Sequence, residues 1–327
     1  MQQFARISGW GSYSPSKILT NAELETLVQT NDEWIRSRTG IVERRLADCD
    51  ETTSSMSIAA AKVALERAGV DAADLDLVIC TTTTPDYQLP ATASLIQREL
   101  GAVKAGAFDL NSACTGFMSG FLCGSQFIMA GTYKKVLVIG AETLSRFVDW
   151  TDRNTCVLFG DGAAAVVLEA SDTRCGMLSC FMGSHGDTEG MLTIPAGGAA
   201  IPASDDTVDE KMHVIRMNGS ELFKVAVRKM QQASEECLKK LGLTTTDIKM
   251  VIPHQANTRI IDSLQSALGL TTEQVFVNID KYGNTGSASV PLALAEYLDK
   301  GLVVKGDKLL LVSFGGGISW AAAVVEW

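Results

Sequence analysis

Three residues of the chain have complementary side-chain chemistry and similar sequence contexts. Cys114 in NSACTG and Asn284 in YGNTGS each precede a predicted helix, and His254 in PHQAN follows a predicted apolar strand. A cysteine at a helix N-terminus feels the positive end of the helix dipole, which favours the nucleophilic thiolate. An imidazole and an amide that converge on one point could donate hydrogen bonds to an enolate or an oxyanion. These residue types suggest covalent catalysis through Cys114, with His254 and Asn284 stabilising negative charge.

Each of these residues also has a simpler structural interpretation. Most cysteines behave as small buried side chains, a lone histidine is more often packed or on the surface, and Asn beside Gly is a common turn residue. Asn257, which ends PHQAN, is well placed to cap the helix that follows. The other seven cysteines lie in predicted strands, helices or loops without a comparable turn, so we interpret them as structural.

The elements that must position these residues occur twice along the chain. Each half is predicted to contain, in the same order, a helix, an apolar strand, a helix, a strand, a turn, a helix and two strands. Continuous apolar strands such as VLVIGA and KLLLVSF are typical of sheets covered on both faces, and their alternation with helices predicts largely parallel sheets. We divide the chain into halves 1–172 and 173–327, with a strand predicted in VFVNID of the second half. The predicted helices cover residues 54–68, 91–101, 115–130, 219–241, 257–269 and 286–299.

The spacing of the repeat indicates where the reactive side chains meet. Thr81 and Cys114 are 33 residues apart, and His254 and Asn284 are 30 residues apart. Sites in open α/β sheets lie beyond the carboxyl ends of the strands, so two facing halves would bring Cys114, His254 and Asn284 to a shared cleft. FGGG after the last but one strand could place a backbone N–H beside an oxyanion, or could simply end the strand. Residues 185–217, rich in Gly, Pro, Asp and Ala, predict a long excursion between the halves.

Composition excludes several other classes of protein. The chain has 327 residues, 46% of them hydrophobic, and a formal net charge of −10, which disfavours a nucleic-acid binder. The N-terminus lacks the apolar core of a signal peptide, and no run of about 18 apolar residues occurs, so we expect a cytoplasmic protein without a membrane span. The three histidines are far apart and no CxxC pair occurs, so we expect no metal site and free thiols. The GxxxxGK[ST] nucleotide loop and the GxSxG hydrolase elbow are also absent from the sequence.

Seven motifs, distributed over nearly the whole chain, resemble those of β-ketoacyl-acyl-carrier-protein synthase III, a condensing-enzyme family of the thiolase superfamily. They are TNDEWIRSRTGIVERR (30–45), ACTGF (113–117), DWTDR (149–153), FGDGA (159–163), PHQAN (253–257), KYGNTGSAS (281–289) and FGGGISW (314–320). Their order and separation make the resemblance specific. It implies a five-layered αβαβα fold of two duplicated halves, a homodimer, and a catalytic triad of Cys114, His254 and Asn284.

The resemblance also implies the reaction. Cys114 would take an acyl group from an acyl-coenzyme A primer as a thioester. His254 and Asn284 would then hold the carbonyl of malonyl-acyl-carrier protein while carbon dioxide leaves, and the resulting carbanion would attack the acyl group on Cys114. The backbone N–H groups of Cys114 and Gly317 would form the oxyanion hole. No cofactor is expected, because coenzyme A enters as a substrate carrier.

Five further residues match binding positions of the family. Trp34 and Arg153 would sandwich the adenine of coenzyme A, and Arg38 would lie near its phosphates. Lys224 and Arg259 would receive the acyl-carrier protein. The alternatives are core packing for Trp34, a surface ion pair for Arg153, and ordinary solvated charges for Lys224 and Arg259.

The sequence leaves the primer and the pathway open. Tyr87, Gln88 and Leu89, in the 84–91 loop, could line the primer pocket of a partner subunit. A relative on the same scaffold could load starters for polyketide or quinolone synthesis. A cysteine hydrolase would transfer the acyl group to water, and a binding scaffold would not need Cys114.

Overall fold

The first half of the chain folds around a five-stranded mixed sheet. The computed structural model describes residues 3–186 and 190–327. β4 pairs in parallel with β5 and β6, whereas β7 is antiparallel to both β6 and β1. The strands run in the order β1 (Phe4–Tyr13), β7 (Asp161–Ser171), β6 (Lys135–Thr143), β4 (Leu77–Thr81) and β5 (Gly106–Leu110).

The second half repeats this order in a four-stranded sheet. β11 pairs in parallel with β12, and β13 is antiparallel to β12 and to β8. From one edge to the other, the strands are β8 (Gly176–Ser184), β13 (Ser319–Glu326), β12 (Lys308–Gly315) and β11 (Met250–Pro253). The division that the sequence suggests after residue 172 falls in the connection between β7 and β8.

The prediction of a strand in VFVNID is wrong: among the described residues, a single bridge between Val251 and Val275 occupies the place that β5 has in the first half. The side chain of Gln255 takes over the backbone groups that a strand would pair. Its Nε2 donates to the carbonyl of Phe276 at 3.1 Å, and its Oε1 accepts from the N–H of Asn278 at 3.0 Å. The chain then turns into the short helix α9 (Ile279–Tyr282).

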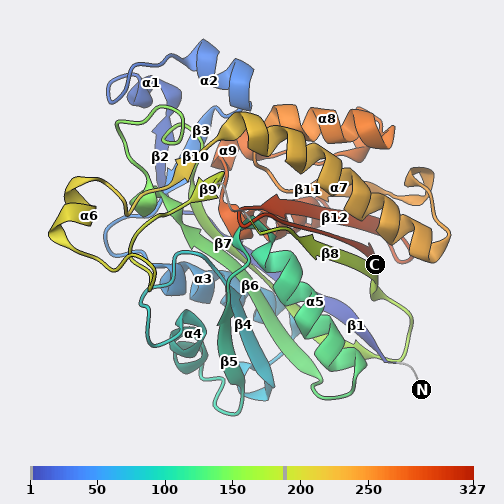
Figure 1. Cartoon of the computed structure of the whole chain (residues 1–327). Helices are drawn as coiled ribbons and strands as arrows, with labels where there is room; N and C mark the ends of the chain where they lie inside the picture. The colour runs from blue at the N-terminus through green and yellow to red at the C-terminus, as the bar shows by residue number, and fades with distance from the viewer. Residues whose placement is uncertain (1–2, 187–189) are drawn as a thin grey trace.

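The helices complete five layers, which confirms the predicted fold. α5 (Gly116–Met129) lies between the two sheets, α3 (Thr53–Ala68) and α4 (Thr92–Leu100) cover the first sheet, and α7 (Gly219–Leu241) and α8 (Thr258–Leu268) cover the second (Figure 1). α10 (Ser289–Asp299) shares the central layer with α5, because its Val290 and Leu294 pack in the same core as residues of both sheets. Alternate strand residues face different layers. Ile79 packs in the central core with Phe117 and Leu311, whereas Val78 packs under α3 and α4. The observed helices agree with the six predicted from the sequence to within a few residues.

Smaller elements lie around the carboxyl ends of the central strands, where Figure 1 shows them gathered at the upper left. Part of the predicted excursion 185–217 forms a ribbon and a short helix, and its residues 187–189 lie outside the described residues. The small elements are β2 (Lys17–Thr20), α1 (Asn21–Leu24), α2 (Asp32–Thr39), β3 (Glu43–Leu46), β9 (Leu192–Thr193), α6 (Asp205–Asp209) and β10 (Arg216–Met217). Single 3₁₀ turns occupy Ala72–Asp74, Ala113–Thr115, Leu144–Phe147, Thr245–Asp247, Thr272–Gln274 and Gly286–Ala288. No helix in the described part of the chain is long and apolar enough to cross a bilayer.

Candidate active site

Cys114 lies in a strained turn that both halves hold in place. The turn connects β5 to α5, and Ala113 adopts a left-handed φ of 45°, which a non-glycine residue rarely does. The hydroxyl of Ser313, on β12 of the other half, donates to the carbonyl of Cys114 at 2.8 Å. A Cβ atom on Gly315 would come within 2.7 Å of the Cys114 nitrogen, so only glycine permits this approach. The second sheet therefore packs directly against the thiol-bearing turn.

His254 and Asn284 reach the same region from the second half, and both are buried. The N–H of His254 donates to the carbonyl of Val312 at 2.8 Å, which extends the pairing of β11 with β12 by one residue. Its ring Nδ1 is buried and has no hydrogen-bond partner among the described residues. The Oδ1 atom of Asn284 accepts from the N–H of Gly286 at 2.9 Å. The Nδ2 group is thus the part of this amide that can donate to a ligand.

The electrostatics of the site differ from the sequence expectation. Burial raises the pKa of the Cys114 thiol to about 12, and the negative charge of Glu142 adds to this rise. The sequence predicts a preference for the thiolate, but burial and the nearby carboxylate favour the neutral thiol of Cys114 instead. Burial also lowers the pKa of His254 to about 4. With these pKa values, the thiol of Cys114 and the imidazole of His254 are both neutral at pH 7.

Two cavities meet at Cys114. The first, which we call the basic cavity, has a volume of about 840 Å³. The second, the apolar cavity, has a volume of about 580 Å³. Cys114 lines both of them. The basic cavity is lined, among others, by Trp34, Arg38, Lys224, His254, Arg259 and Asn284. Leu144, Phe159, Leu192, Ile194, Ile215 and Ile318 supply apolar lining of the second cavity. A molecule bound in the basic cavity can thus reach the thiol, which lies at the entrance to a space suited to hydrocarbon.

The structure brings together most of the residues that the sequence singles out. Arg153 does not line the basic cavity, but its guanidinium lies over the Trp34 ring, 5.1 Å from the ring centre. The guanidinium of Arg38 lies 5.8 Å from the centre of the same ring. Lys224 is exposed and forms an ion pair with Glu221 at 2.9 Å.

Arg259 and Gly317 also lie at the cavities. The exposed guanidinium of Arg259 is stacked over the Phe223 ring at 5.5 Å. Gly317, with a φ of 105°, lines the apolar cavity, and a Cβ atom there would have no neighbour within 4 Å. Its backbone is therefore open to a ligand.

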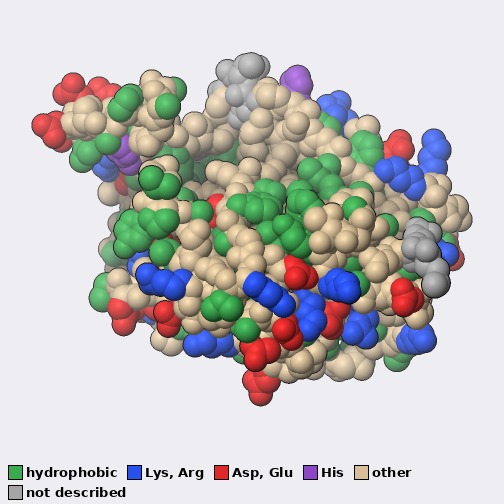
Figure 2. All heavy atoms as spheres, turned by 90° about the horizontal axis from the view of Figure 1, so that it is seen from below, with side chains coloured by type: hydrophobic (Ala, Val, Ile, Leu, Met, Phe, Trp, Pro, Cys, Tyr) green, Lys and Arg blue, Asp and Glu red, His purple; other side chains and the backbone are tan. Residues whose placement is uncertain are grey.

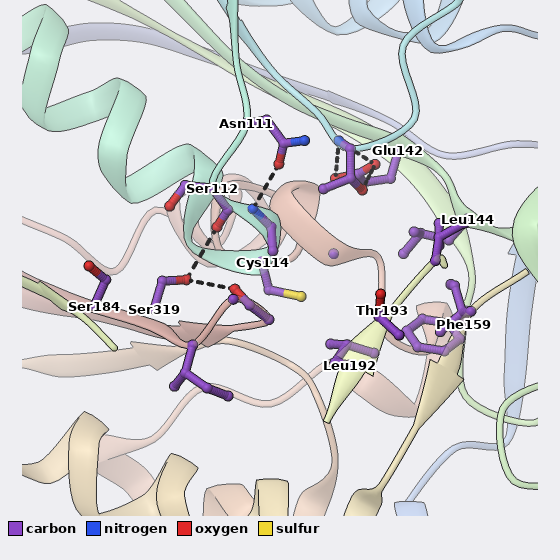
Figure 3. Close-up of a pocket in the computed structure, with 18 residues that line it drawn as sticks. Asn111, Ser112, Cys114, Glu142, Leu144, Phe159, Ser184, Leu192, Thr193 and Ser319 are labelled. Atoms are coloured by element: carbon purple, nitrogen blue, oxygen red, sulfur yellow. Dashed lines mark hydrogen bonds between the residues drawn. The ribbon is translucent and has the colours of Figure 1, made fainter. Parts of the chain in front are cut away.

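Sequence reasoning misses Glu142, a fully buried carboxylate that lines the apolar cavity with Cys114 (Figure 3). Figure 3 shows the Cys114 sulfur pointing into this space, with Leu144, Phe159 and Leu192 around it. The sequence contains a signal for this residue, since Glu142 directly follows the apolar run VLVIGA, near the carboxyl end of a predicted strand. The lining residues come from separate segments and carry no local pattern.

Comparison with known proteins gives a consistent family relationship. Residues 108–186 match the family model described as 3-oxoacyl-[acyl-carrier-protein (ACP)] synthase III, and residues 238–327 match its C-terminal model. The chain is 51% identical over 323 residues to β-ketoacyl-[acyl-carrier-protein] synthase III of Caldanaerobacter subterraneus subsp. tengcongensis, covering 99% of this chain and 98% of that one.

Two solved structures extend the comparison. 3-Oxoacyl-[acyl-carrier-protein] synthase III from Aquifex aeolicus VF5 is 46% identical with a TM-score of 0.91, covering 99% of this chain and 100% of that one. The priming β-ketosynthase from the R1128 polyketide biosynthetic pathway is 37% identical with a TM-score of 0.92, covering 99% and 96% of the two chains.

The raised pKa of Cys114 predicts how its alkylation depends on pH. Iodoacetamide reacts with the thiolate, so the rate at Cys114 should rise about tenfold per pH unit between pH 6 and pH 9 without a plateau. Mass spectrometry of the Cys114 peptide measures this rate, and Cys114→Ser identifies the signal. A plateau below pH 9 would show that the thiol is activated in the unliganded protein.

Proposed function

The chain belongs to the β-ketoacyl-[acyl-carrier-protein] synthase III family, and from this membership we propose a two-step mechanism that proceeds through an acyl thioester on Cys114. It is an acyl-transferring condensing enzyme of fatty acid synthesis, which uses an acyl-coenzyme A and malonyl-acyl-carrier protein. The observation that carries the mechanism is the position of Cys114 at the junction of the two cavities, with His254 and Asn284 lining the basic one.

The first step transfers the acyl group. The Cys114 sulfur attacks the carbonyl carbon of acyl-coenzyme A, the bond from that carbon to the coenzyme A sulfur breaks, and free coenzyme A leaves with the proton of the thiol. The N–H groups of Cys114 and Gly317 stabilise the oxyanion between these events. The acyl chain then extends into the apolar cavity.

The second step forms the carbon–carbon bond. Malonyl-acyl-carrier protein brings its thioester to the basic cavity, the bond to the terminal carboxylate breaks, and carbon dioxide leaves. The electron pair remains as an enolate, whose oxygen accepts hydrogen bonds from His254 and from Nδ2 of Asn284. The enolate carbon attacks the acyl carbonyl, and the bond to Cys114 breaks. The thiolate then takes a proton from solvent. Because both steps balance without an oxidant, a reductant or a metal ion, we propose that the enzyme has no separate cofactor.

Coenzyme A and the carrier protein use the mouth of the basic cavity in this proposal. The adenine would stack on Trp34 and Arg153, and Arg153, now 5.1 Å from the centre of the Trp34 ring, would move outward to admit it. Arg38 faces the phosphates. Lys224 and Arg259 contact the carrier protein, which is acidic. The enzyme itself has a net charge of −10, so it would repel such a partner over most of its surface. Local positive charge at the mouth is therefore needed for docking.

We propose that the enzyme is a homodimer joined along β5. This strand ends the first sheet, and an unpaired edge strand is a template for pairing with a second copy. In the neighbouring loop, Tyr87 is 60% exposed and Leu89 is 88% exposed. From below, the side where β5 and α4 lie in Figure 1, hydrophobic side chains gather in the middle of the face and charged ones along its lower border (Figure 2). The 84–91 loop would then close the partner's primer cavity.

A starter-loading role in secondary metabolism is the second candidate, because the chain is similar to a priming ketosynthase of a polyketide pathway. A survey of acyl-coenzyme A primers, read by mass spectrometry of Cys114, separates the two. Preference for short fatty acyl primers supports fatty acid initiation.

The two half-reactions test the assigned roles. Cys114→Ala should abolish transfer of radiolabelled acetyl from acetyl-coenzyme A. Asn284→Asp should leave this transfer within about threefold but slow condensation with malonyl-acyl-carrier protein about a hundredfold, because a donor to the enolate is lost. Equal loss of both steps in Asn284→Asp would contradict the division of roles. Release of free acetate without malonyl substrate would instead indicate a hydrolase.

Trp34, at the mouth of the basic cavity, has a matched control in Trp10, which lies outside that cavity. Trp10 is half-buried like Trp34 and also has an arginine, Arg67, over its ring at 5.1 Å. Trp34→Ala should raise KM for acyl-coenzyme A about tenfold, because a stacking partner of the adenine is lost. Trp10→Ala should leave this KM unchanged. Steady-state kinetics measure both, and equal effects would remove Trp34 from the nucleotide site.

Charge reversal tests the carrier-protein surface. Arg259→Glu should raise KM for malonyl-acyl-carrier protein about five- to tenfold, and the effect should shrink as salt is added. Lys249→Glu, an exposed reversal outside the basic cavity, is the control. A KM that is insensitive to salt, together with equal effects of the two variants, would indicate a mainly apolar contact.

A further inference from the structure

Glu142 is a buried carboxylate for which the proposed mechanism has no role. It lies near the carboxyl end of β6, between the two halves, and no part of it is exposed to solvent. Burial raises its pKa, while hydrogen bonds from Thr84, Thr83 and Ser287 oppose that rise. Burying a carboxylate costs free energy of folding unless hydrogen bonds compensate for the lost water. The hydrogen bonds of Glu142 therefore indicate its function.

One oxygen of Glu142 gathers the three threonines that follow β4. Its Oε2 accepts the hydroxyls of Thr84 at 2.7 Å, Thr83 at 2.9 Å and Thr82 at 3.3 Å, as well as the N–H of Thr83 at 3.1 Å. The Thr84 hydroxyl also accepts the N–H of Thr143 at 2.9 Å, which ties the same segment to β6. Glu142 thus fixes the start of the 84–91 loop.

The other oxygen contacts the turn that carries Asn284. Oε1 accepts the N–H of Ser287 at 3.4 Å, and also that of Thr83 at 3.1 Å. The Ser287 hydroxyl donates to the carbonyl of Thr81 at 2.7 Å. A Cβ atom on Gly286 would lie 2.9 Å from Cγ of Glu142, so the carboxylate side chain packs against this turn. The N–H of Gly286 is in turn the donor that orients the Asn284 amide.

We propose that Glu142 is a positioning residue for condensation, whose carboxylate joins the Thr82–Thr84 segment to the Gly286–Ser287 turn and so directs Nδ2 of Asn284 towards the enolate. This inference rests on the proposed function and adds to it a residue that acts through the turn carrying Asn284. Glu142 can make these contacts only when the two halves pack against each other as they do here. In this packing, Asn284 and Cys114 line the same cavity.

The contacts require two acceptor oxygens, which only a carboxylate supplies. The N–H groups of Thr83 and Ser287 can only donate, and both face Oε1. In Glu142→Gln, the amide can take two orientations. With its NH₂ group in place of Oε1, it would face the N–H donors of Thr83 and Ser287. With its NH₂ group in place of Oε2, it would face the N–H of Thr83 and displace the threonine hydroxyls. The turn would shift, and small shifts of reacting groups are costly to catalysis. Acyl transfer to Cys114 does not use Asn284 and should be spared.

The experiment measures the two half-reactions separately in Glu142→Gln. Condensation of pre-acetylated enzyme with malonyl-acyl-carrier protein should fall at least about tenfold, and acetyl transfer from acetyl-coenzyme A should fall by no more than about threefold. The pH profile of Cys114 alkylation supplies a second readout. Burial and, to a smaller extent, the charge of Glu142 raise the pKa of Cys114, so removal of this charge should move the profile to lower pH. A packing defect that hydrates the thiol would move it in the same direction, so the ratio of the two half-reaction rates decides between the two causes. Parallel loss of both half-reactions would overturn the inference.

Asp161 provides a matched control. It is also fully buried, accepts the N–H groups of Ser145 at 2.9 Å and Ala47 at 2.7 Å, and lines neither cavity. Asp161→Asn should lower the melting temperature without changing the ratio of the two half-reaction rates or the alkylation profile. An altered ratio in this variant would show that any buried carboxylate has the same effect.

A milder variant keeps the test open if Glu142→Gln does not fold. Thr83→Val removes one hydroxyl that donates to Oε2 of Glu142 and keeps the backbone N–H contact. It should slow condensation about threefold more than acetyl transfer, and equal slowing of the two steps would overturn the inference. Wild-type enzyme that acetylates but never condenses would instead refute the proposed function.

Discussion

The close packing of the two halves at the carboxyl ends of their central strands is the constraint on which the site depends. Gly315 lets β12 approach the Cys114 turn, and Gly140 lets β6 approach the Ser287 turn, where a Cβ atom would lie 2.5 Å from the Ser287 carbonyl oxygen. Each sheet thus supports the reactive turn of the other half. Without this contact, the thiol of Cys114 and the amide of Asn284, which come from different halves, would have no fixed distance or orientation.

The same packing determines the electrostatics. Burial neutralises both titratable members of the site, raising the pKa of Cys114 and lowering that of His254. A neutral imidazole can donate one hydrogen bond to an enolate without competing for its charge as a cation would. A neutral thiol resists adventitious alkylation.

The arrangement of the two cavities separates recognition from chemistry. Cationic and aromatic side chains line the basic cavity, and aliphatic side chains supply much of the apolar one, so a thioester can bind with its polar carrier on one side and its acyl chain on the other. Cys114 is where the two meet. This arrangement suits a reaction in which two carriers use one entrance in turn while the acyl group stays on the enzyme.

The sequence by itself determined the duplicated βα plan, the six long helices and the candidates Cys114, His254 and Asn284. These depend on local patterns: apolar runs, helix periodicity, and polar residues at strand ends. It predicted a strand in VFVNID because that segment is apolar and β-branched, but the Gln255 side chain, supplied by a distant segment, satisfies its backbone instead. The raised pKa of Cys114, the joining of the cavities and the contacts of Glu142 became visible only in the folded chain. Burial, cavity shape and the partners of a carboxylate all depend on which distant segments pack together, and no local pattern records that.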